Sequence, residues 1–168
     1  MKSRLKSRLQ NFALFLVIPI LGFVCDYASK IAIINSVCMP QAIVEIFPFF
    51  NFVCVLNTGV SFGFLAGIEN GKMILLTITI GILFFIFFLM YKEKSPFVKY
   101  CYSVIISGAI GNIYDRLIHG GVIDFLDFFV ASYHYPAFNI ADSLIFIGIC
   151  GIFGHQFFTR KDSAKTIK

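Results

Sequence analysis

The chain has 168 residues, of which 58% are hydrophobic and only 14% are charged, and its mean hydropathy is +0.86. Soluble domains hold about 45–50% apolar and about 25% charged residues, and a domain of this size cannot bury such an apolar excess, so an ordinary water-soluble fold is excluded. The net charge of +5 does not indicate a nucleic-acid partner, because most basic residues flank apolar segments instead of forming a phosphate-binding patch.

Four apolar runs are long enough for membrane-spanning helices, which need about 20 mostly apolar residues. The first run covers residues 12–34 and has the basic start of a signal peptide. Its apolar stretch resumes after Asp26–Lys30 without a clear cleavage site, which favours a retained span. The other runs cover residues 73–91, 97–117 and 136–158. We therefore expect an integral membrane protein, mainly α-helical, with four transmembrane helices in a single membrane domain over residues 1–168.

Basic residues gather on one side of this predicted bundle. They occupy the N-terminal tail, the gap between the second and third runs, and the C-terminal tail: Lys2, Arg4, Lys6, Arg8, Lys92, Lys94, Lys99, Arg160, Lys161, Lys165 and Lys168. Because basic loops tend to stay in the cytoplasm, both termini are expected to be cytoplasmic. Segments 35–72 and 118–135 are then expected to be extracytoplasmic.

The first outer segment contains a stretch rich in phenylalanine and valine over residues 43–55, which favours a strand over a helix. So many aromatic residues also indicate a position at the membrane interface. We expect a small β-rich extracytoplasmic cradle between the first two spans. Cys38 and Cys54 share this segment and could pair, although five cysteines offer no disulfide framework, and the sequence leaves the pairing open.

Polar residues that are costly in lipid gather near the predicted outer ends of the spans, and such residues are candidates for a functional site. In chain order they are Asp26, Ser29, Lys30, Asn57, Asn112, Asp115, Arg116, Asp124, Asp127, Asn139 and Asp142. The inner halves of the spans carry almost nothing polar. This distribution predicts a polar site just below the outer membrane surface.

Some of these residues have simpler structural explanations. Asp26 and Lys30 are four residues apart and could form an ion pair along a helix face, as an alternative to positioning a ligand. Asp115 and Arg116 could anchor a helix end among the lipid headgroups. Asp127 is expected to be a solvated loop acid.

The remaining candidates differ in how easily a structural role explains them. Asn57 and Gly59 could be turn residues, and Asp142 could stabilise the start of a helix. Asp124 is harder to explain in this way, because it lies between apolar neighbours. The chain has no GxSxG motif, and its histidines lack metal-ligand spacing. Two carboxyl groups that share one proton can activate water and protonate a leaving nitrogen, so an aspartic hydrolase is chemically coherent.

Five motifs in chain order resemble those of the bacterial lipoprotein signal peptidase family, also called signal peptidase II. They are Asp26-Tyr27-Ala28-Ser29-Lys30, Asn57-Thr58-Gly59-Val60-Ser61-Phe62-Gly63, Gly108-Ala109-Ile110-Gly111-Asn112-Ile113-Tyr114-Asp115-Arg116-Leu117, Val122-Ile123-Asp124-Phe125 and Phe138-Asn139-Ile140-Ala141-Asp142-Ser143. The resemblance covers nearly the whole chain. One departure is Tyr135, which stands where members often carry tryptophan.

The resemblance implies an aspartic endopeptidase whose catalytic dyad is Asp124 and Asp142. It implies that further residues organise the site: Asn57, Gly59, Asn112, Asp115, Arg116 and Asn139, with Asp26 and Lys30 as a supporting pair. The implied substrate is a prolipoprotein whose lipobox cysteine carries diacylglycerol, cleaved just before that cysteine. No metal or organic cofactor is implied.

The resemblance also implies a place and partners for the chain. It would be a multi-pass protein of the bacterial cytoplasmic (inner) membrane, in contact with membrane lipids, with its active site near the outer leaflet. Cyclic peptides of the globomycin type would inhibit it, and a monomer is expected. The apolar segment 43–67 could act as a cradle and lid over the substrate.

Other functional classes can use the same acids. A proton-coupled carrier needs polar residues across the bilayer, and the second span lacks them. In a non-enzymatic scaffold, Asp124 and Asp142 would only bond neighbouring helices. The other class of two-aspartate intramembrane protease has a GxGD motif, which this chain does not contain. The sequence therefore favours the signal peptidase II interpretation.

Overall fold

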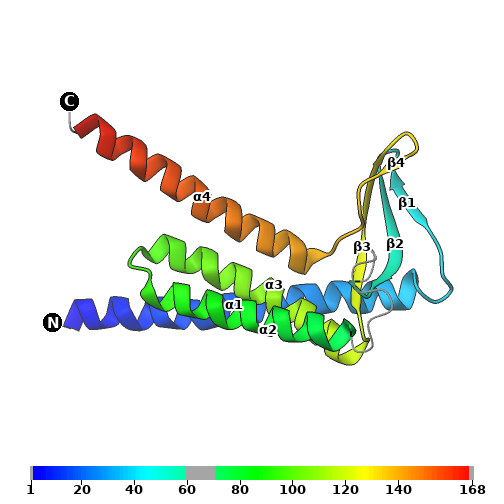
Figure 1. Cartoon of the computed structure of the whole chain (residues 1–168), viewed down its shortest axis with the longest axis horizontal. Helices are drawn as coiled ribbons and strands as arrows, with labels where there is room; N and C mark the ends of the chain where they lie inside the picture. The colour runs from blue at the N-terminus through cyan, green and yellow to red at the C-terminus, as the bar shows by residue number, and fades with distance from the viewer. Residues whose placement is uncertain (1, 60–70, 167–168) are drawn as a thin grey trace.

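A computed structural model of the chain describes the backbone of residues 2–59 and 71–166, and the side chains of residues 15–59 and 73–159. Its elements in chain order are α1 (Lys2–Ser36), β1 (Val44–Phe47), β2 (Phe50–Asn57), α2 (Gly71–Lys92), α3 (Pro96–Ile118), β3 (Val122–Val130), β4 (Tyr133–His134) and α4 (Ile140–Thr166). The helices form a bundle, and the sheet lies across one end of it (Figure 1). The start of α1 and the end of α4 both lie at the opposite end.

Within the described residues, three helices are long and apolar enough to cross a membrane, namely Phe15–Ser36, Met73–Lys92 and Ile140–Thr159. Helix α3 is not among them. It packs against each of the other three helices, and its buried face carries polar groups such as Ser103, Ser107 and Asn112. The mainly helical membrane architecture expected from the sequence is therefore supported. The fourth span predicted over residues 97–117 is not, because α3 does not have the apolar composition of the other three helices.

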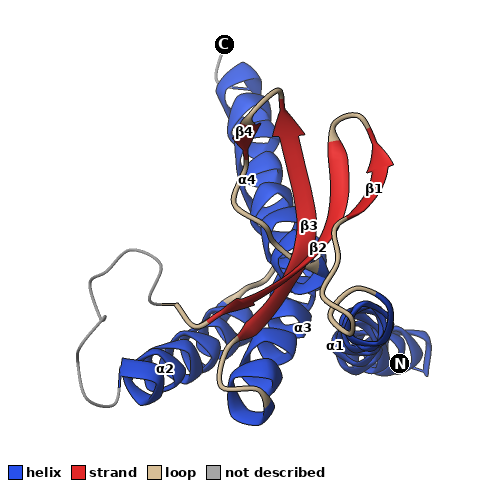
Figure 2. Ribbon diagram, turned by 90° about the vertical axis from the view of Figure 1, so that its right-hand side faces the viewer, coloured by secondary structure: helices blue, strands red, loops and turns tan. Residues whose placement is uncertain are grey.

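The sheet is antiparallel throughout, with the strand order β1-β2-β3-β4. The strand predicted over residues 43–55 is a hairpin of two strands, because the chain turns between Phe47 and Phe50. The predicted β-rich segment between the first two helices is present as β1 and β2, and strands β3 and β4 from segment 118–135 extend the same sheet. Figure 2 shows β2 and β3 crossing the ends of the helices.

Two helix boundaries also differ from the sequence-based ones. Helix α1 begins at Lys2 and ends at Ser36, beyond both ends of the apolar run 12–34. Helix α4 begins at Ile140, four residues later than the predicted start at Pro136. The reason is that Phe138 pairs with β3, since its carbonyl oxygen accepts the Leu126 N–H at 2.8 Å.

An apolar cluster joins the end of α1 to the sheet. Ile33 of α1 and Val37, the residue that follows α1, pack against Phe125 of β3, and all three side chains are buried. Cys38 and Cys54 lie at the edge of this cluster and form a disulfide, which the sequence had left undecided. This cluster fixes the sheet on the bundle, so that both supply residues to one site.

Candidate active site

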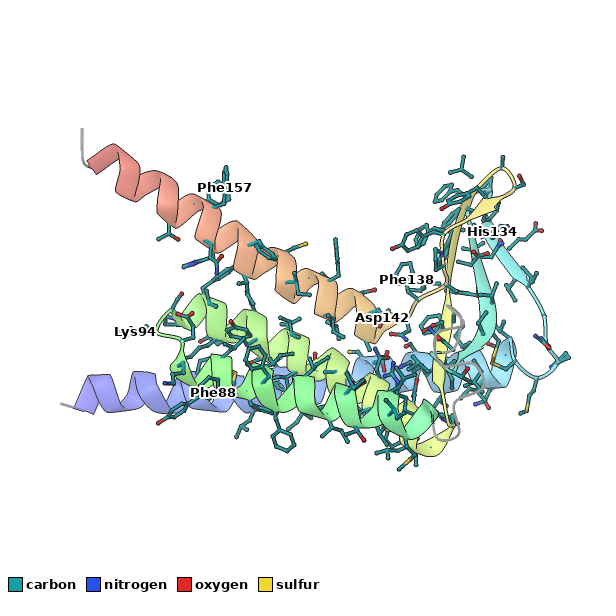
Figure 3. The ribbon with its side chains drawn as sticks, in the orientation of Figure 1. Phe88, Lys94, His134, Phe138, Asp142 and Phe157 are labelled. Atoms are coloured by element: carbon teal, nitrogen blue, oxygen red, sulfur yellow. A yellow bond between two sulfur atoms is a disulfide. The ribbon has the colours of Figure 1, made fainter. Side chains whose placement is uncertain are left out.

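The two acids predicted as a dyad meet where the bundle joins the sheet. Asp124 is on β3 and is 2% exposed. Asp142 is in the first turn of α4 and is half-buried. Figure 3 shows Asp142 at this junction, on the same side of the sheet as Phe138. The two carboxyl groups are close enough for the charge of Asp142 to affect the titration of Asp124.

Asn139 bonds to both acidic residues. Its Nδ2 donates to Asp124 Oδ1 at 2.7 Å, its Oδ1 accepts the Asp142 backbone N–H at 2.9 Å, and its own backbone N–H donates to Asp142 Oδ2 at 3.3 Å. Asn112 of α3 adds a second support, because its Nδ2 donates to Asp142 Oδ1 at 2.7 Å. Asn139 Nδ2 also lies 3.2 Å from Asn112 Oδ1. The acid on β3 and the acid on α4 are therefore held by two asparagine side chains, one from α3 and one from the residue before α4.

The end of strand β2 completes the set of donors around Asp124. Asn57 Nδ2 donates to Asp124 Oδ2 at 2.9 Å, while Asn57 Oδ1 accepts the Gly59 N–H at 2.9 Å. Gly59 has φ +75°, and a Cβ atom there would collide with the Leu75 side chain of α2. Asn57 and Gly59 therefore form a turn that also places the Asn57 amide against Asp124. The rest of their motif, residues 60–63, lies outside the described residues.

A buried ion cluster holds the backbone next to both acids. Lys30 Nζ lies 2.7 Å from Asp26 Oδ2 and 2.8 Å from Asp115 Oδ2, and all three side chains are buried. Asp26 Oδ1 accepts the Ala141 N–H at 2.8 Å, and Asp115 Oδ2 accepts the Ile123 N–H at 3.1 Å. Each carboxylate thus holds the backbone immediately before one acid of the dyad.

This cluster resolves two alternatives left by the sequence. Asp26 and Lys30 do form an ion pair along α1, but one that faces the protein interior. The interpretation of Asp115 as a headgroup anchor was wrong, because its carboxylate is buried beside Lys30. Arg116 is only partly buried; its Nη1 donates to the Asn112 carbonyl oxygen at 3.1 Å, and its charge acts on both Asp124 and Asp142.

Two glycines of α3 allow the helices to approach this closely. A Cβ atom on Gly108 would collide with the Ala141 carbonyl oxygen of α4. A Cβ atom on Gly111 would lie 2.5 Å from Asp26 Oδ2. Both glycines belong to a motif seen in the sequence, but their role depends on contacts with α1 and α4 that spacing along α3 does not reveal.

The environments of the two acids differ. Burial, followed by the nearby negative charge of Asp142, raises the pKa of Asp124 to about 6, against the lowering effect of the hydrogen bonds from Asn57 and Asn139. Asp142 is more exposed and lies in the first turn of α4. Two carboxyl groups in unlike surroundings are typical of acid–base catalysis.

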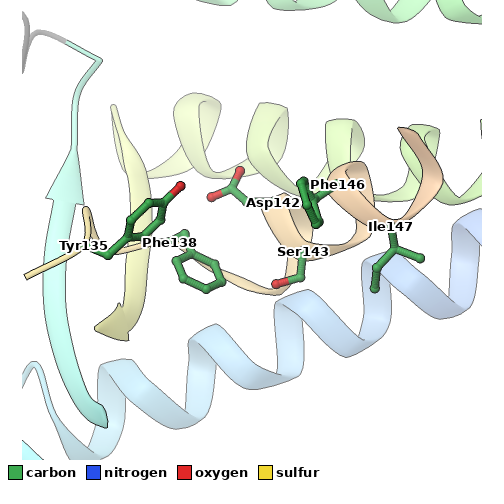
Figure 4. A pocket seen from close by; sticks show the side chains of 6 residues that line it. All are labelled: Tyr135, Phe138, Asp142, Ser143, Phe146 and Ile147. Carbon is green, nitrogen blue, oxygen red and sulfur yellow. The ribbon is translucent and has the colours of Figure 1, made fainter. Parts of the chain in front are cut away.

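A cavity of about 530 Å³ opens beside Asp142 (Figure 4). Its lining residues are Tyr135, Phe138, Asp142, Ser143, Phe146 and Ile147. Phe146 and Ile147 are exposed on the outer face of α4, so the cavity is continuous with the surface that would meet lipid. An apolar ligand could therefore approach the dyad from the membrane.

A second buried acid on β3, Asp127, lies three residues after Asp124. Asp127 was expected to be a solvated loop acid, but it is 5% exposed. His134 Nδ1 lies 2.9 Å from both of its carboxyl oxygens, and Asn51 Nδ2 donates to it at 3.2 Å. The apolar neighbours of Asp127 in β3 were the available signal for a strand. Figure 3 shows His134 on the opposite side of the sheet from Phe138.

The arrangement as a whole can perform acid–base chemistry on a bound amide. The raised pKa of Asp124 suits this acid to hold a proton, and amide donors fix the orientation of both carboxyl groups. Among the side chains that the structure describes, no three His, Cys, Asp or Glu groups gather closely enough to hold a metal ion. The remaining predicted site residues, from Asp26 to Asn139, all lie around the same junction of α1, α3, α4 and the sheet.

Comparisons with known proteins agree with this geometry. The sequence model of the signal peptidase (SPase) II family matches residues 18–158. The chain is 44% identical over 138 residues to the lipoprotein signal peptidase of Alteromonas mediterranea, covering 80% of this chain and 75% of that protein. It is 37% identical over 157 residues to the lipoprotein signal peptidase of Shewanella oneidensis, covering 90% and 92% of the two chains.

Solved structures show the same fold. A bacterial membrane enzyme determined by the in meso method at 2.3 Å has a TM-score of 0.73 and 28% identity, covering 88% of this chain and 90% of that one. A second bacterial membrane enzyme, determined at 1.9 Å, has a TM-score of 0.72 and 32% identity, covering 84% and 91%. With the family match spanning most of its length, the chain belongs to the signal peptidase II family.

Proposed function

We propose that this peptidase is an aspartic endopeptidase that removes the signal peptide from diacylglyceryl-modified prolipoproteins just before the lipidated cysteine. The observation that carries this proposal is the pairing of Asp124 and Asp142 through Asn139, with one acid buried and the other half-exposed. Such a pair supplies both a base and an acid near neutral pH. Membership of the signal peptidase II family supports the choice of a lipoprotein precursor as substrate.

The environments of the two acids divide the work between them. Asp142 accepts a proton from the attacking water as the new C–O bond forms, while protonated Asp124 donates its proton to the carbonyl oxygen of the scissile amide. When the tetrahedral intermediate collapses, Asp142 passes its proton to the leaving nitrogen, and the oxygen returns a proton to Asp124. Atoms and charges balance, and the dyad ends in its starting state.

The position of the cavity supports a lipid-anchored substrate. A precursor with two acyl chains keeps its scissile bond near the headgroups, and the cavity beside Asp142 opens onto the apolar face of α4. The substrate's acyl chains would lie along Phe146 and Ile147 while the amide reaches the dyad. Cyclic peptides of the globomycin type would compete for the same place.

We also propose an orientation in which α3 is a fourth span, both termini are cytoplasmic, and the sheet lies at the outer face of the bacterial inner membrane. Three points support it: the basic tails, the common end of the bundle at which α1 starts and α4 ends, and the disulfide on the sheet side, since disulfides persist in oxidising compartments. The protein would act as a single-domain monomer.

The cradle proposal concerns the described part of segment 43–67. Phe47 and Phe49 are exposed and stack on each other with ring centroids 5.6 Å apart, as expected of side chains that rest at a lipid interface. Residues 60–67 of the predicted lid lie outside the described residues. Charged replacements of Phe47 or Phe49 should therefore lower cleavage of a membrane-embedded substrate.

Purified protein and a lipidated prolipoprotein provide the test. Asp124→Asn and Asp142→Asn should each abolish cleavage, because the amide neither donates nor accepts the required proton, while each keeps the helical circular dichroism of the wild type. Asp127→Asn is the matched control: Asp127 is a buried acid on the same strand as Asp124, but it bonds to His134 and Asn51, and the variant should retain turnover. Turnover in either dyad variant would falsify the assignment.

A further inference from the structure

Strand β2 changes register against β3 in its middle. Phe52 pairs with Leu126 and Val55 pairs with Asp124, so two residues of β2, including Cys54, lie opposite one residue of β3. This is a β-bulge, which bends a strand and redirects the side chains that follow it. The bulge therefore sets the register of the last residues of β2.

The residue whose direction depends most on this register is Asn57. It lies three residues after Cys54 and donates to Asp124 Oδ2 at 2.9 Å. A shift of one residue in a strand turns every side chain to the opposite face of the sheet. If the bulge moved or relaxed, Asn57 would lose its hydrogen bond to Asp124.

A covalent bond holds the bulge in place. Cys54 is joined to Cys38, which lies two residues beyond the end of α1 and donates its N–H to the Ile33 carbonyl oxygen at 3.1 Å. The buried Val37 beside it packs against Phe125, the residue opposite the bulge. The bridge thus ties the bulge of β2 to the same helix that carries the ion cluster. Both cysteines are half-buried, so a small thiol can reach the bond.

We propose that the Cys38–Cys54 disulfide is a redox-sensitive positioning element, which keeps Asn57 hydrogen-bonded to Asp124 by fixing the bulge of β2. Reduction by a dithiol transfers two electrons and two protons, so that the S–S bond becomes two thiols and the dithiol becomes a disulfide. The reduced enzyme keeps its fold but holds Asn57 less firmly. This inference rests on the proposed function, because it gives Asn57 a role at the catalytic dyad.

The sign of the effect on proton affinity follows from the contacts of Asp124. The Asn57 hydrogen bond stabilises the charged carboxylate and lowers its pKa, so loss of this bond raises the pKa. The charged groups that act on Asp124 are Asp142 of α4, Lys30 of α1 and Arg116 of α3. Lys30 lies on α1, to whose end the disulfide ties β2, whereas Asn57 lies on β2 itself, three residues after Cys54. We assign the effect of reduction to Asn57, and the Asn57→Ala variant tests that assignment.

The experiment compares oxidised and dithiothreitol-reduced enzyme in a background where the three free cysteines, Cys25, Cys101 and Cys150, are replaced by alanine. Loss of one hydrogen bond to a charged group corresponds to about a tenfold change in rate. We expect reduction to lower kcat about tenfold and to move the alkaline limb of the kcat/KM profile, where the pair loses its shared proton, to higher pH. Cys38→Ser/Cys54→Ser should behave like the reduced enzyme.

Asn57→Ala separates positioning from general stabilisation. In that variant reduction should leave the residual kcat and the pH profile unchanged, because the hydrogen bond is already absent. An unchanged kcat on reduction of the wild type, an equal loss in Asn57→Ala, or loss of helical circular dichroism on reduction would each overturn the inference. These outcomes leave the dyad assignment intact, which only an active Asp124→Asn or Asp142→Asn variant would remove.

Discussion

The buried ion cluster gives the most demanding prediction, because the single ammonium group of Lys30 pairs with two buried carboxyl groups. Its Nζ lies 2.7 Å from Asp26 Oδ2 and 2.8 Å from Asp115 Oδ2. With an effective dielectric constant of about 20, each pair has a gross attraction of about 6 kcal/mol, most of which offsets the desolvation of the charges. Removing one partner of such a buried group costs about 3–5 kcal/mol.

Lys30→Met keeps most of the length of the side chain and removes the charged ammonium group together with its hydrogen bonds. We expect it to lower the free energy of unfolding by about 3–5 kcal/mol and to lower kcat, since Asp26 and Asp115 would no longer hold the backbone beside the dyad. The measurement is denaturant unfolding in detergent micelles, followed by helical circular dichroism, together with cleavage of the lipidated substrate.

A charge-free version of the cluster is the matched control. Lys30→Met combined with Asp26→Asn and Asp115→Asn retains an amide oxygen to accept each backbone N–H and leaves no unpaired charge. This triple variant should recover most of the stability lost in Lys30→Met. A single variant within about 1 kcal/mol of the wild type, or a triple variant less stable than the single one, would refute the reasoning.

Three further predictions concern other parts of the site. Because the pKa of Asp124 is raised to about 6 in the folded protein, the protonated carboxyl group stabilises the fold fully below about pH 4, and this stabilisation is lost as the pH rises through 6. In unfolding measurements between pH 4 and 7, the stability of Asp124→Asn should therefore rise by up to about 3 kcal/mol relative to the wild type, whereas a constant difference would contradict this. Gly108→Ala should destabilise the protein and abolish cleavage, because the added Cβ would collide with α4. Gly81 has open space around it, so Gly81→Ala should leave stability unchanged or raise it by up to about 1 kcal/mol in the same assays. Phe146→Ser should raise KM for a lipidated precursor with little change in kcat, and Phe157→Ser, exposed elsewhere on α4, should not; equal effects would argue against acyl chains beside Asp142.

The helices could be predicted because lipid demands long apolar runs, and the three most apolar ones form the candidate spans. Helix α3 shows the limit of that signal: it is enclosed by its neighbours, so its polar residues serve contacts inside the protein. Strand β3 was missed because Asp124 and Asp127 interrupt its apolar residues, and Asp127 was interpreted as a solvated loop acid. Both are buried in the folded chain and bonded to asparagines from another strand.

The candidate site residues could be named from the sequence because polar groups stand out near the ends of apolar runs, and the resemblance to a family suggested their roles, but their arrangement needed the structure. Nothing in the spacing of Asp26 and Ala141, 115 residues apart, indicates that a carboxylate of α1 accepts a backbone N–H of α4. The same holds for the bridge between Cys38 and Cys54, where the sequence admitted pairing but could not show that the bulge of β2 lies beside the end of α1. Long-range contacts of this kind depend on packing, which local patterns do not encode.

The most direct measurement of the central claim is an experimental structure of the enzyme with a lipidated peptide whose scissile amide is replaced by a non-cleavable isostere. The account predicts that the carbon corresponding to the scissile carbonyl lies between Asp124 and Asp142, with a carboxyl oxygen of each within about 3.5 Å of the isostere or of the water that attacks it, and with the acyl chains beside α4. A scissile position outside reach of either carboxyl group would contradict it.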